Sequence, residues 1–159
     1  MKVSCGIDNG VSGTVAVVAE DEVVFEKTPV FKVLNYTKKK GYVNRVDVDK
    51  LKEMLEPYVQ YKPIVKVERP MVNPGRFKAT VSAIRALEAT TIALEQLGLG
   101  YKFVDSKEWQ KEFLPSGIKG APALKEASKM KGIQLYPHLR EKIEKHGDAD
   151  SIFIALTDK

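Results

Sequence analysis

Apolar and polar residues along the chain follow two periods, the two-residue period of strands and the longer period of helices. Residues 2–7 alternate and predict a first strand. The apolar runs at residues 15–19 and 23–27, joined by the letters EDE, predict a β-hairpin. Residues 35–45 are basic and polar and include a glycine, so we expect an exposed loop there.

The remainder of the chain predicts helices that alternate with two further strands. Residues 49–61 have a helical period that Pro57 should disturb near its end. Strands are expected over residues 64–67, just before Glu68, and 101–105, and helices over residues 80–97, 106–114, 121–131 and 148–159. Ser106 is the expected N-cap of the helix over 106–114. This order predicts one α/β domain over residues 1–159, with a mixed sheet.

Composition narrows the class of protein. The 159 residues are 43% apolar and 30% charged, which is typical of one soluble globular domain. Lys and Arg number 26 against 21 Asp and Glu, and this excess suits a polyanionic partner without proving one. The one cysteine, Cys5, lies in an apolar run, so it is expected in the core rather than in a disulfide or a zinc site. No apolar run has the length of a membrane span, and we expect a cytoplasmic protein with no membrane partner.

Acidic residues stand where three of the predicted elements begin or end. Asp8 follows the first strand, Glu68 follows the strand over 64–67, and Asp148 and Asp150 open the last helix. Each alone has another explanation, because Asp8 and Asp148 can be caps and Glu68 can be an exposed loop charge. If the two strands are neighbours, however, the acids converge and repel one another. Magnesium, which prefers carboxylate and water oxygens, would relieve that repulsion.

The segments GIDNGVSG, VKVERP and HGDADSIFIAL resemble the acidic motifs of RuvC-like Holliday junction resolvases, within the RNase H-like superfamily. The segment DSKEWQKEFLPSGIKG is similar to a lysine-bearing stretch of the phage members, and the likeness covers nearly the whole chain in the same order. The resemblance implies an RNase H-like fold with a mixed five-stranded sheet flanked by helices. It also implies a homodimeric, magnesium-dependent endonuclease that makes paired symmetric nicks in four-way DNA junctions. Two Mg²⁺ ions would act in each site, with Mn²⁺ as a substitute.

The resemblance also assigns metal ligands, by direct motif match, to Asp8, Glu68 and Asp150. The family usually has a further ligand three positions before the last one, but Gly147 stands there in this sequence. Asp148 is therefore the expected fourth ligand, with His146 as its substitute. Residues two apart on a helix point to roughly opposite faces, so Asp148 can share a site with Asp150 only from the N-cap.

A catalytic lysine is implied as well, and Lys119 and Lys125 best match its position. Lys107 and Lys111 are further candidates, expected to contact DNA. Any of these lysines can equally be a solvated charge. The family's dimer interface corresponds to the helix over residues 80–97, although an ordinary buried helix explains its composition equally well.

The segment RPMVNPGRFKA after Glu68 offers cations and exposed-looking apolar side chains together. Arg76 and Lys78 can hold phosphates, while Met71 or Phe77 can stack on an unpaired base or wedge into the crossover. The alternative is that Met71 and Phe77 pack this loop onto the core. A second basic and aromatic group, formed by Tyr42, Arg45 and residues 38–40, is expected to contact flanking DNA, and Trp109 is expected in the core.

Three other functions stay open from the sequence. The letters DNGVSGTVAVV also resemble the first phosphate loop of sugar kinases and actin-like ATPases, but those enzymes need a second lobe and a second glycine-rich motif. A non-catalytic protein could bind junctions through its basic surface. A nuclease of the same chemistry could also cut flaps, forks or Y-junctions.

Overall fold

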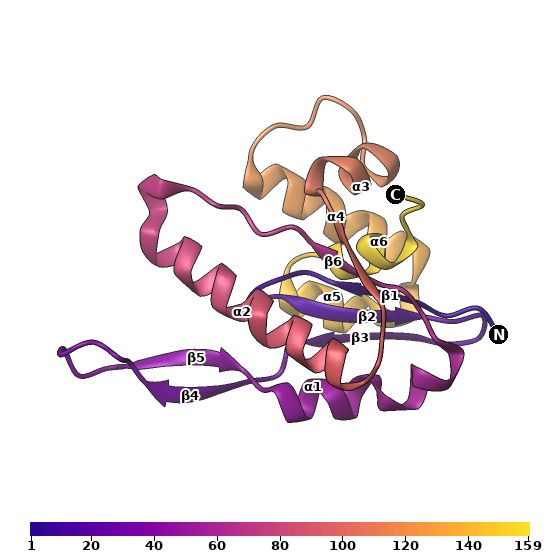
Figure 1. Cartoon of the computed structure of the whole chain (residues 1–159). Helices are drawn as coiled ribbons and strands as arrows, with labels where there is room; N and C mark the ends of the chain where they lie inside the picture. Colours follow the sequence, from indigo (N-terminus) through magenta and orange to yellow (C-terminus); the bar gives the residue numbers. More distant parts are fainter.

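A computed structural model describes all residues from 1 to 159, and its centre is a five-stranded sheet in the order β3-β2-β1-β6-β7 (Figure 1). The strands are β1 (Ser4–Ile7), β2 (Thr14–Val18), β3 (Val23–Lys27), β6 (Val65–Glu68) and β7 (Tyr101–Val104). Strands β1, β2 and β3 pair antiparallel, whereas β6 pairs parallel with both β1 and β7. The expected α/β fold with a mixed five-stranded sheet is therefore confirmed.

Helices cover both faces of this sheet and separate two apolar cores. One face packs against α1 (Val48–Leu55) and α2 (Phe77–Gln96), through side chains such as Ile7, Val67 and Leu94. The other face packs against the C-terminal helices, through side chains such as Phe25 and Phe153. These helices are α3 (Ser106–Phe113), α4 (Ala121–Leu135), α5 (Arg140–His146) and α6 (Asp150–Leu156). None of the helices is long and apolar enough to cross a membrane.

The ends of the predicted helices differ in detail from the observed ones. Helix α1 stops before Pro57, and a 3-10 helix, η1 (Glu56–Tyr61), continues the chain. A second 3-10 turn, η2 (Pro74–Arg76), leads into α2, which therefore begins three residues earlier than expected. The N-cap of α3 is Asp105 and not Ser106, because Asp105 and Glu108 form a reciprocal capping box. A third 3-10 turn, η3 (Pro137–Leu139), and α5 were not expected from the sequence.

A two-stranded ribbon stands apart from the main sheet and corrects the expected loop over residues 35–45. Strands β4 (Val30–Leu34) and β5 (Tyr42–Val46) pair antiparallel and project from the body (Figure 1). Residues 35–41 form an exposed turn, as expected, whereas residues 42–45 belong to β5, where the exposed polar side chains of Asn44 and Arg45 obscure the strand period. Its register places Leu34 opposite Tyr42, and the turn between them is closed by the Asn35 amide, which donates to the Gly41 carbonyl at 2.8 Å.

Helix α6 lies unusually close to the central strand β1. A Cβ atom added to Gly6 would lie 2.3 Å from both the Ala155 nitrogen and the Ser151 carbonyl oxygen. At the same interface, the Thr14 hydroxyl donates to the Ser151 hydroxyl at 2.8 Å. Glycine at position 6 therefore sets the depth at which α6 sits on the sheet.

We expect Gly6→Ala to destabilise the protein by about 2 kcal/mol or more, because the new methyl group overlaps the backbone of α6. Gly41→Ala is the matched control, since a Cβ atom there meets nothing within 4 Å. The free energy of unfolding would be measured in urea for both variants. Equal stability of the two would show that α6 does not depend on this close approach.

Candidate metal centre

Four carboxylates converge at one edge of the sheet. Ile7 pairs with Val67 across the parallel strands β1 and β6, so Asp8 and Glu68, the next residue on each strand, leave the sheet side by side. Asp148 and Asp150 reach the same place from the start of α6, which packs on β1. Asp8, Asp148 and Asp150 line a pocket of about 700 Å³, and Glu68 lines an adjoining groove of about 270 Å³. Asn9 lines both hollows, so they meet at that residue.

The turn after β1 holds Asp8 at this edge. The Asp8 amide donates to the Thr14 carbonyl at 3.0 Å, and this bond closes the connection from β1 to β2. A Cβ atom on Gly13 would lie 2.0 Å from the Asp8 carbonyl oxygen, so the turn can close only on a glycine. The glycines of the GIDNGVSG segment therefore fix the backbone beside the acid.

Glu68 is oriented by the one tryptophan of the chain. The Trp109 indole N–H donates to Glu68 Oε2 at 2.8 Å. Trp109 is buried, which confirms its expected place in the core, and its ring stacks on Phe153 of α6. Arg69, which follows Glu68, bridges to Asp105 at the start of α3 with an N–O distance of 2.7 Å. Helix α3, which carries Trp109, is thereby tied to the end of the strand that carries Glu68.

The two aspartates near α6 share one site because only one of them is in the helix. Asp148 precedes the N-cap residue, Ala149, and its Oδ1 accepts from the Asp150 amide at 3.1 Å. Asp148 was expected at the N-cap if it is to share a site with Asp150, and it lies one residue before the N-cap. The Ser128 hydroxyl of α4 donates to Asp150 Oδ1 at 2.5 Å and accepts from the Ala149 amide at 3.0 Å.

His146 also lies at this centre, together with Asp148. It is the last residue of α5, and its Nε2 is 3.6 Å from Asp148 Oδ2. Ligand atoms of Asp8, His146 and Asp148 lie within 4.8 Å of one another, so these residues form a group that can hold a metal ion. His146 and Asp148 are thus not alternatives, since the fold brings both to the cluster.

Burial and the convergence of the acids raise the pKa of three of them, Asp8, Glu68 and Asp150. Burial raises the pKa of Asp8 well above its usual value, and the charges of Glu68, Asp150 and Asp148 add to that rise. Burial and the Asp148 charge raise the pKa of Asp150 to about 7, although the Ser128 hydrogen bond opposes the change. Burial likewise raises the pKa of Glu68, while the Trp109 hydrogen bond lowers it. Without a cation the cluster therefore holds protons that isolated carboxyl groups would have lost at neutral pH.

The donor set fits a divalent metal ion. The carboxylate oxygens suit Mg²⁺ or Mn²⁺, and no lysine or arginine forms a salt bridge with any of the acids of the cluster. The chain has two buried side-chain polar atoms without a hydrogen-bond partner, Asn9 Oδ1 and Thr28 Oγ1. Both residues line the acid pocket. Native structures rarely leave such atoms unpaired, and a hydrated ion in this pocket would supply partners for them.

The lysines proposed from the sequence lie in different places. Lys125 of α4 lines the acid pocket, and its charge lowers the pKa of both Asp8 and Asp150. Lys119 is exposed on the connection between α3 and α4 and does not line the pocket. Lys107 and Lys111 are exposed on α3, also outside it.

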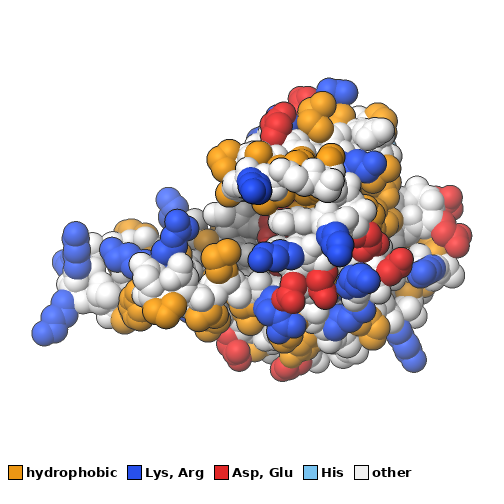
Figure 2. All heavy atoms as spheres, turned by 90° about the horizontal axis from the view of Figure 1, so that it is seen from above, with side chains coloured by type: hydrophobic (Ala, Val, Ile, Leu, Met, Phe, Trp, Pro, Cys, Tyr) orange, Lys and Arg blue, Asp and Glu red, His pale blue; other side chains and the backbone are white.

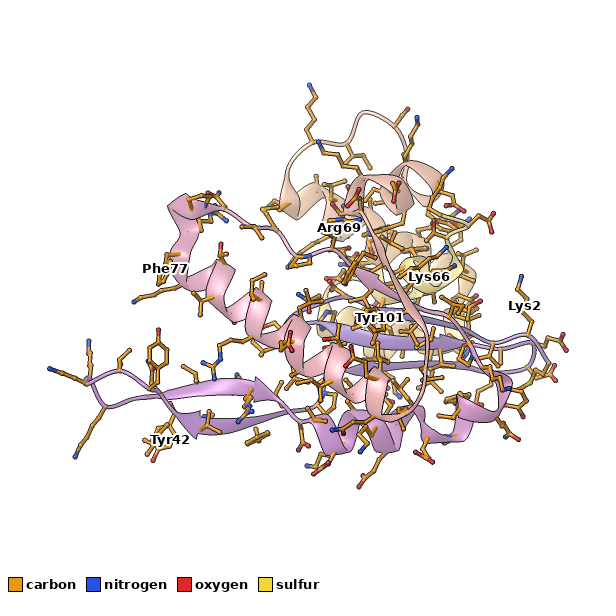
Figure 3. The ribbon with its side chains drawn as sticks, in the orientation of Figure 1. Lys2, Tyr42, Lys66, Arg69, Phe77 and Tyr101 are labelled. Carbon is orange, nitrogen blue, oxygen red and sulfur yellow. The ribbon has the colours of Figure 1, made fainter.

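The segment after Glu68 is exposed and divides between two grooves. Met71 and Arg76 line the groove that contains Glu68, whereas Phe77 and Lys78 line a second groove, about 780 Å³, between α2 and the hairpin. The side chains of Met71 and Phe77 are 76% and 69% exposed, so the alternative that they pack this loop onto the core is wrong. Figure 3 shows Phe77 at the N-terminal end of α2, on the side of the hairpin.

Three residues that support the site were not singled out for it from the sequence. Ser128 holds Asp150, Trp109 holds Glu68, and the Asn9 side-chain amide donates to the Ala83 carbonyl of α2 at 3.1 Å. Asn9 adjoins Asp8, which is a usable signal in the sequence. Ser128 and Trp109 come from distant helices, and no local pattern marks their contacts.

In the metal-free protein we expect Asp150→Asn to raise the melting temperature at pH 7.5 by about 3 °C or more, which is about 1 kcal/mol for a chain of this size. The folded-state pKa of Asp150, about 7, exceeds the unfolded value near 4, so the wild type loses stability as the pH rises from about 4 to 7. The asparagine cannot ionise and avoids that loss. The gain should shrink at pH 5, as measured by thermal unfolding in EDTA. A gain that does not depend on pH would contradict this account.

Comparison with known proteins gives solved structures and no sequence relatives. No family model matches the chain, and no curated protein matches it. The structure of T. thermophilus RuvC in complex with Holliday junction substrate is similar, with a TM-score of 0.53 and 15% identity over 95% of this chain and 92% of that chain. A second Thermus thermophilus RuvC structure has a TM-score of 0.50 and 14% identity, over 97% of this chain and 95% of that chain. At such identities the likeness is one of fold, and the chain has a RuvC-like fold.

Proposed function

We propose that the protein is a metal-dependent endonuclease that resolves four-way DNA junctions by paired symmetric nicks. The observation that carries this proposal is the cluster of four carboxylates and His146 at the edge of a RuvC-like sheet. The structural neighbour in complex with a Holliday junction substrate supports branched DNA as the partner. A kinase or actin-like ATPase fits poorly, because the chain has one such sheet and no second lobe.

Asp8, Glu68, Asp148 and Asp150 would hold two Mg²⁺ ions, with His146 as a further ligand and Mn²⁺ as a substitute. Four carboxylates balance the charge of two divalent ions, which accounts for so many acids in one recess. Such ions, when bound, supply an activated water and stabilise the leaving oxygen in phosphodiester hydrolysis.

The chain's own residues would orient these ligands and offset charge on the substrate. Trp109 and Ser128 each hold one carboxylate oxygen, which leaves the other oxygen of Glu68 and of Asp150 free of these bonds. Lys125 is exposed at the wall of the pocket, where its ammonium can reach a phosphate. A lysine at that place can stabilise charge that develops on the phosphate during cleavage.

DNA would run over the surfaces that adjoin the acids. Arg76 and Lys78 would hold phosphates, and Met71 or Phe77 would stack on or wedge between bases at the crossover. Lys107 and Lys111 would contact an outlying part of the DNA. Two copies would pair through α2, on which Ile84 and Ile92 are exposed, so that two sites face opposite strands.

The same proposal extends to source and pathway. The resemblance of the lysine-bearing segment supports a protein of the phage-type branch, which would act in recombination or replication in the cytoplasm of the host. Flaps, forks and Y-junctions are a wider substrate range for the same chemistry.

The first test is cleavage of a labelled four-way junction and of its linear arms. We expect paired nicks in the junction only, which require Mg²⁺ and disappear in EDTA. Asp8→Asn should lower the rate about 10³-fold, because a lost metal ligand removes several kcal/mol of transition-state stabilisation. Tight junction binding without cutting under Mg²⁺ or Mn²⁺ would replace the proposal with a binding protein. Equal cutting of flaps and forks would widen the substrate range.

The two lysines can be separated in the same assay. We expect Lys125→Met to lower the single-turnover rate at saturating junction about 10²-fold, because Lys125 lines the acid pocket. Lys119→Met, which removes an exposed charge of the same kind outside the pocket, should stay within a few fold of wild type. The opposite order of effects would assign the catalytic lysine to Lys119.

A further inference from the structure

The hairpin formed by β4 and β5 carries the whole excess of positive charge. Residues 30–46 contain five basic side chains, namely Lys32, Lys38, Lys39, Lys40 and Arg45, and no Asp or Glu. The rest of the chain contains 21 basic and 21 acidic residues and is therefore neutral in sum. Figure 2 shows blue side chains gathered along the extension at the left, which is this hairpin.

These charges are free to meet a partner. All five basic side chains are exposed, and none of them forms a salt bridge. Tyr36 and Tyr42, which flank the lysines of the turn, are 78% and 70% exposed. Cations beside exposed aromatic rings are the combination with which many proteins bind nucleic acid.

The base of the hairpin is part of the acid pocket. Val30 of β4 and Asn44 of β5 line that pocket together with Asp8 and Asp150. From there the ribbon runs outward to the turn, as Figure 3 shows with Tyr42 near the far end. At about 3.3 Å per residue, the four steps of β4 from Val30 to Leu34 span about 13 Å, and the turn that carries the lysines lies beyond them. The length of the strand alone corresponds to about four base pairs of duplex DNA.

We infer that the β4–β5 hairpin lies along a duplex arm of the DNA and binds its phosphates through Lys38, Lys39 and Lys40, about four base pairs or more from the cleavage site. This inference rests on the proposed function, which supplies both the cleavage site and the identity of the substrate. Binding of the hairpin to duplex needs no cutting and can be measured separately.

Duplex DNA fits the hairpin better than a second copy of the chain does. A two-stranded antiparallel ribbon has the width that the major groove admits, and a tip in that groove is close to phosphates on both of its sides. A second copy of the chain would present another positively charged turn, and the rest of that copy has a net charge of zero. Only a polyanion complements three consecutive lysines without an acid nearby.

The test compares two triple variants with the same net charge. One replaces Lys38, Lys39 and Lys40 by Gln, in the turn outside both strands. The control replaces Lys2, Lys50 and Lys159 by Gln, which are equally exposed and have no salt bridge. Binding to a junction with long arms is measured in EDTA over a range of salt, and hydroxyl-radical footprints are recorded on the same complexes. Sedimentation velocity gives the oligomeric state of each variant.

The hairpin variant should lower the slope of log K against log salt by about 2.7, since each phosphate contact contributes about 0.9. Its footprint should lose the protection that lies about four base pairs or more from the cleavage site, while the control keeps both the slope and the footprint of wild type. Equal slopes and footprints for the two variants would overturn the inference. A hairpin variant that changes oligomeric state with an unchanged slope would also overturn it, in favour of a contact between copies. If the wild-type protein does not cut the junction but both variants bind as expected, the nuclease proposal is rejected and the hairpin inference holds.

Discussion

The depth at which α6 sits on β1 is the constraint on which the site depends. Gly6 lets the backbone of α6 come within contact of the strand, so Asp148 and Asp150 arrive beside Asp8 instead of above it. The parallel pairing of β1 with β6 brings Glu68 to the same edge. The cluster is therefore a product of backbone packing, and side chains on four separate segments meet without any local motif that joins them.

That convergence works against the stability of the metal-free chain. Acids pressed together in a recess keep protons or repel one another, and the hydrogen bonds from Trp109 and Ser128 offset only part of this cost. A fold that tolerates such a cluster stores free energy that a divalent cation releases when it binds. The metal would then act on folding as well as on chemistry.

The sequence predicts the parts of this arrangement that follow from local periods. Alternation at residues 2–7 and the apolar run at 15–19 predict the strands, and acids at the ends of two strands predict a cluster if those strands are parallel neighbours, as β1 and β6 are. The contacts of Ser128 and Trp109 depend on how α4 and α3 pack, which no local pattern encodes. The expected loop over 35–45 holds for the turn at 35–41 and fails at 42–45, where β5 is exposed and polar in its second half. The N-cap is Asp105 instead of Ser106, because its reciprocal bond with Glu108 satisfies more donors than Ser106 could.

The bond between the indole of Trp109 and Glu68 has an optical consequence. The chain has a single tryptophan, so its intrinsic emission arises from one ring, buried against Phe153 and joined to one carboxylate of the centre. Whatever changes the charge on Glu68, whether a proton or a cation, changes the electric field across that ring. The protein therefore contains a built-in fluorophore whose spectrum follows the occupancy of its acidic centre, with no label attached.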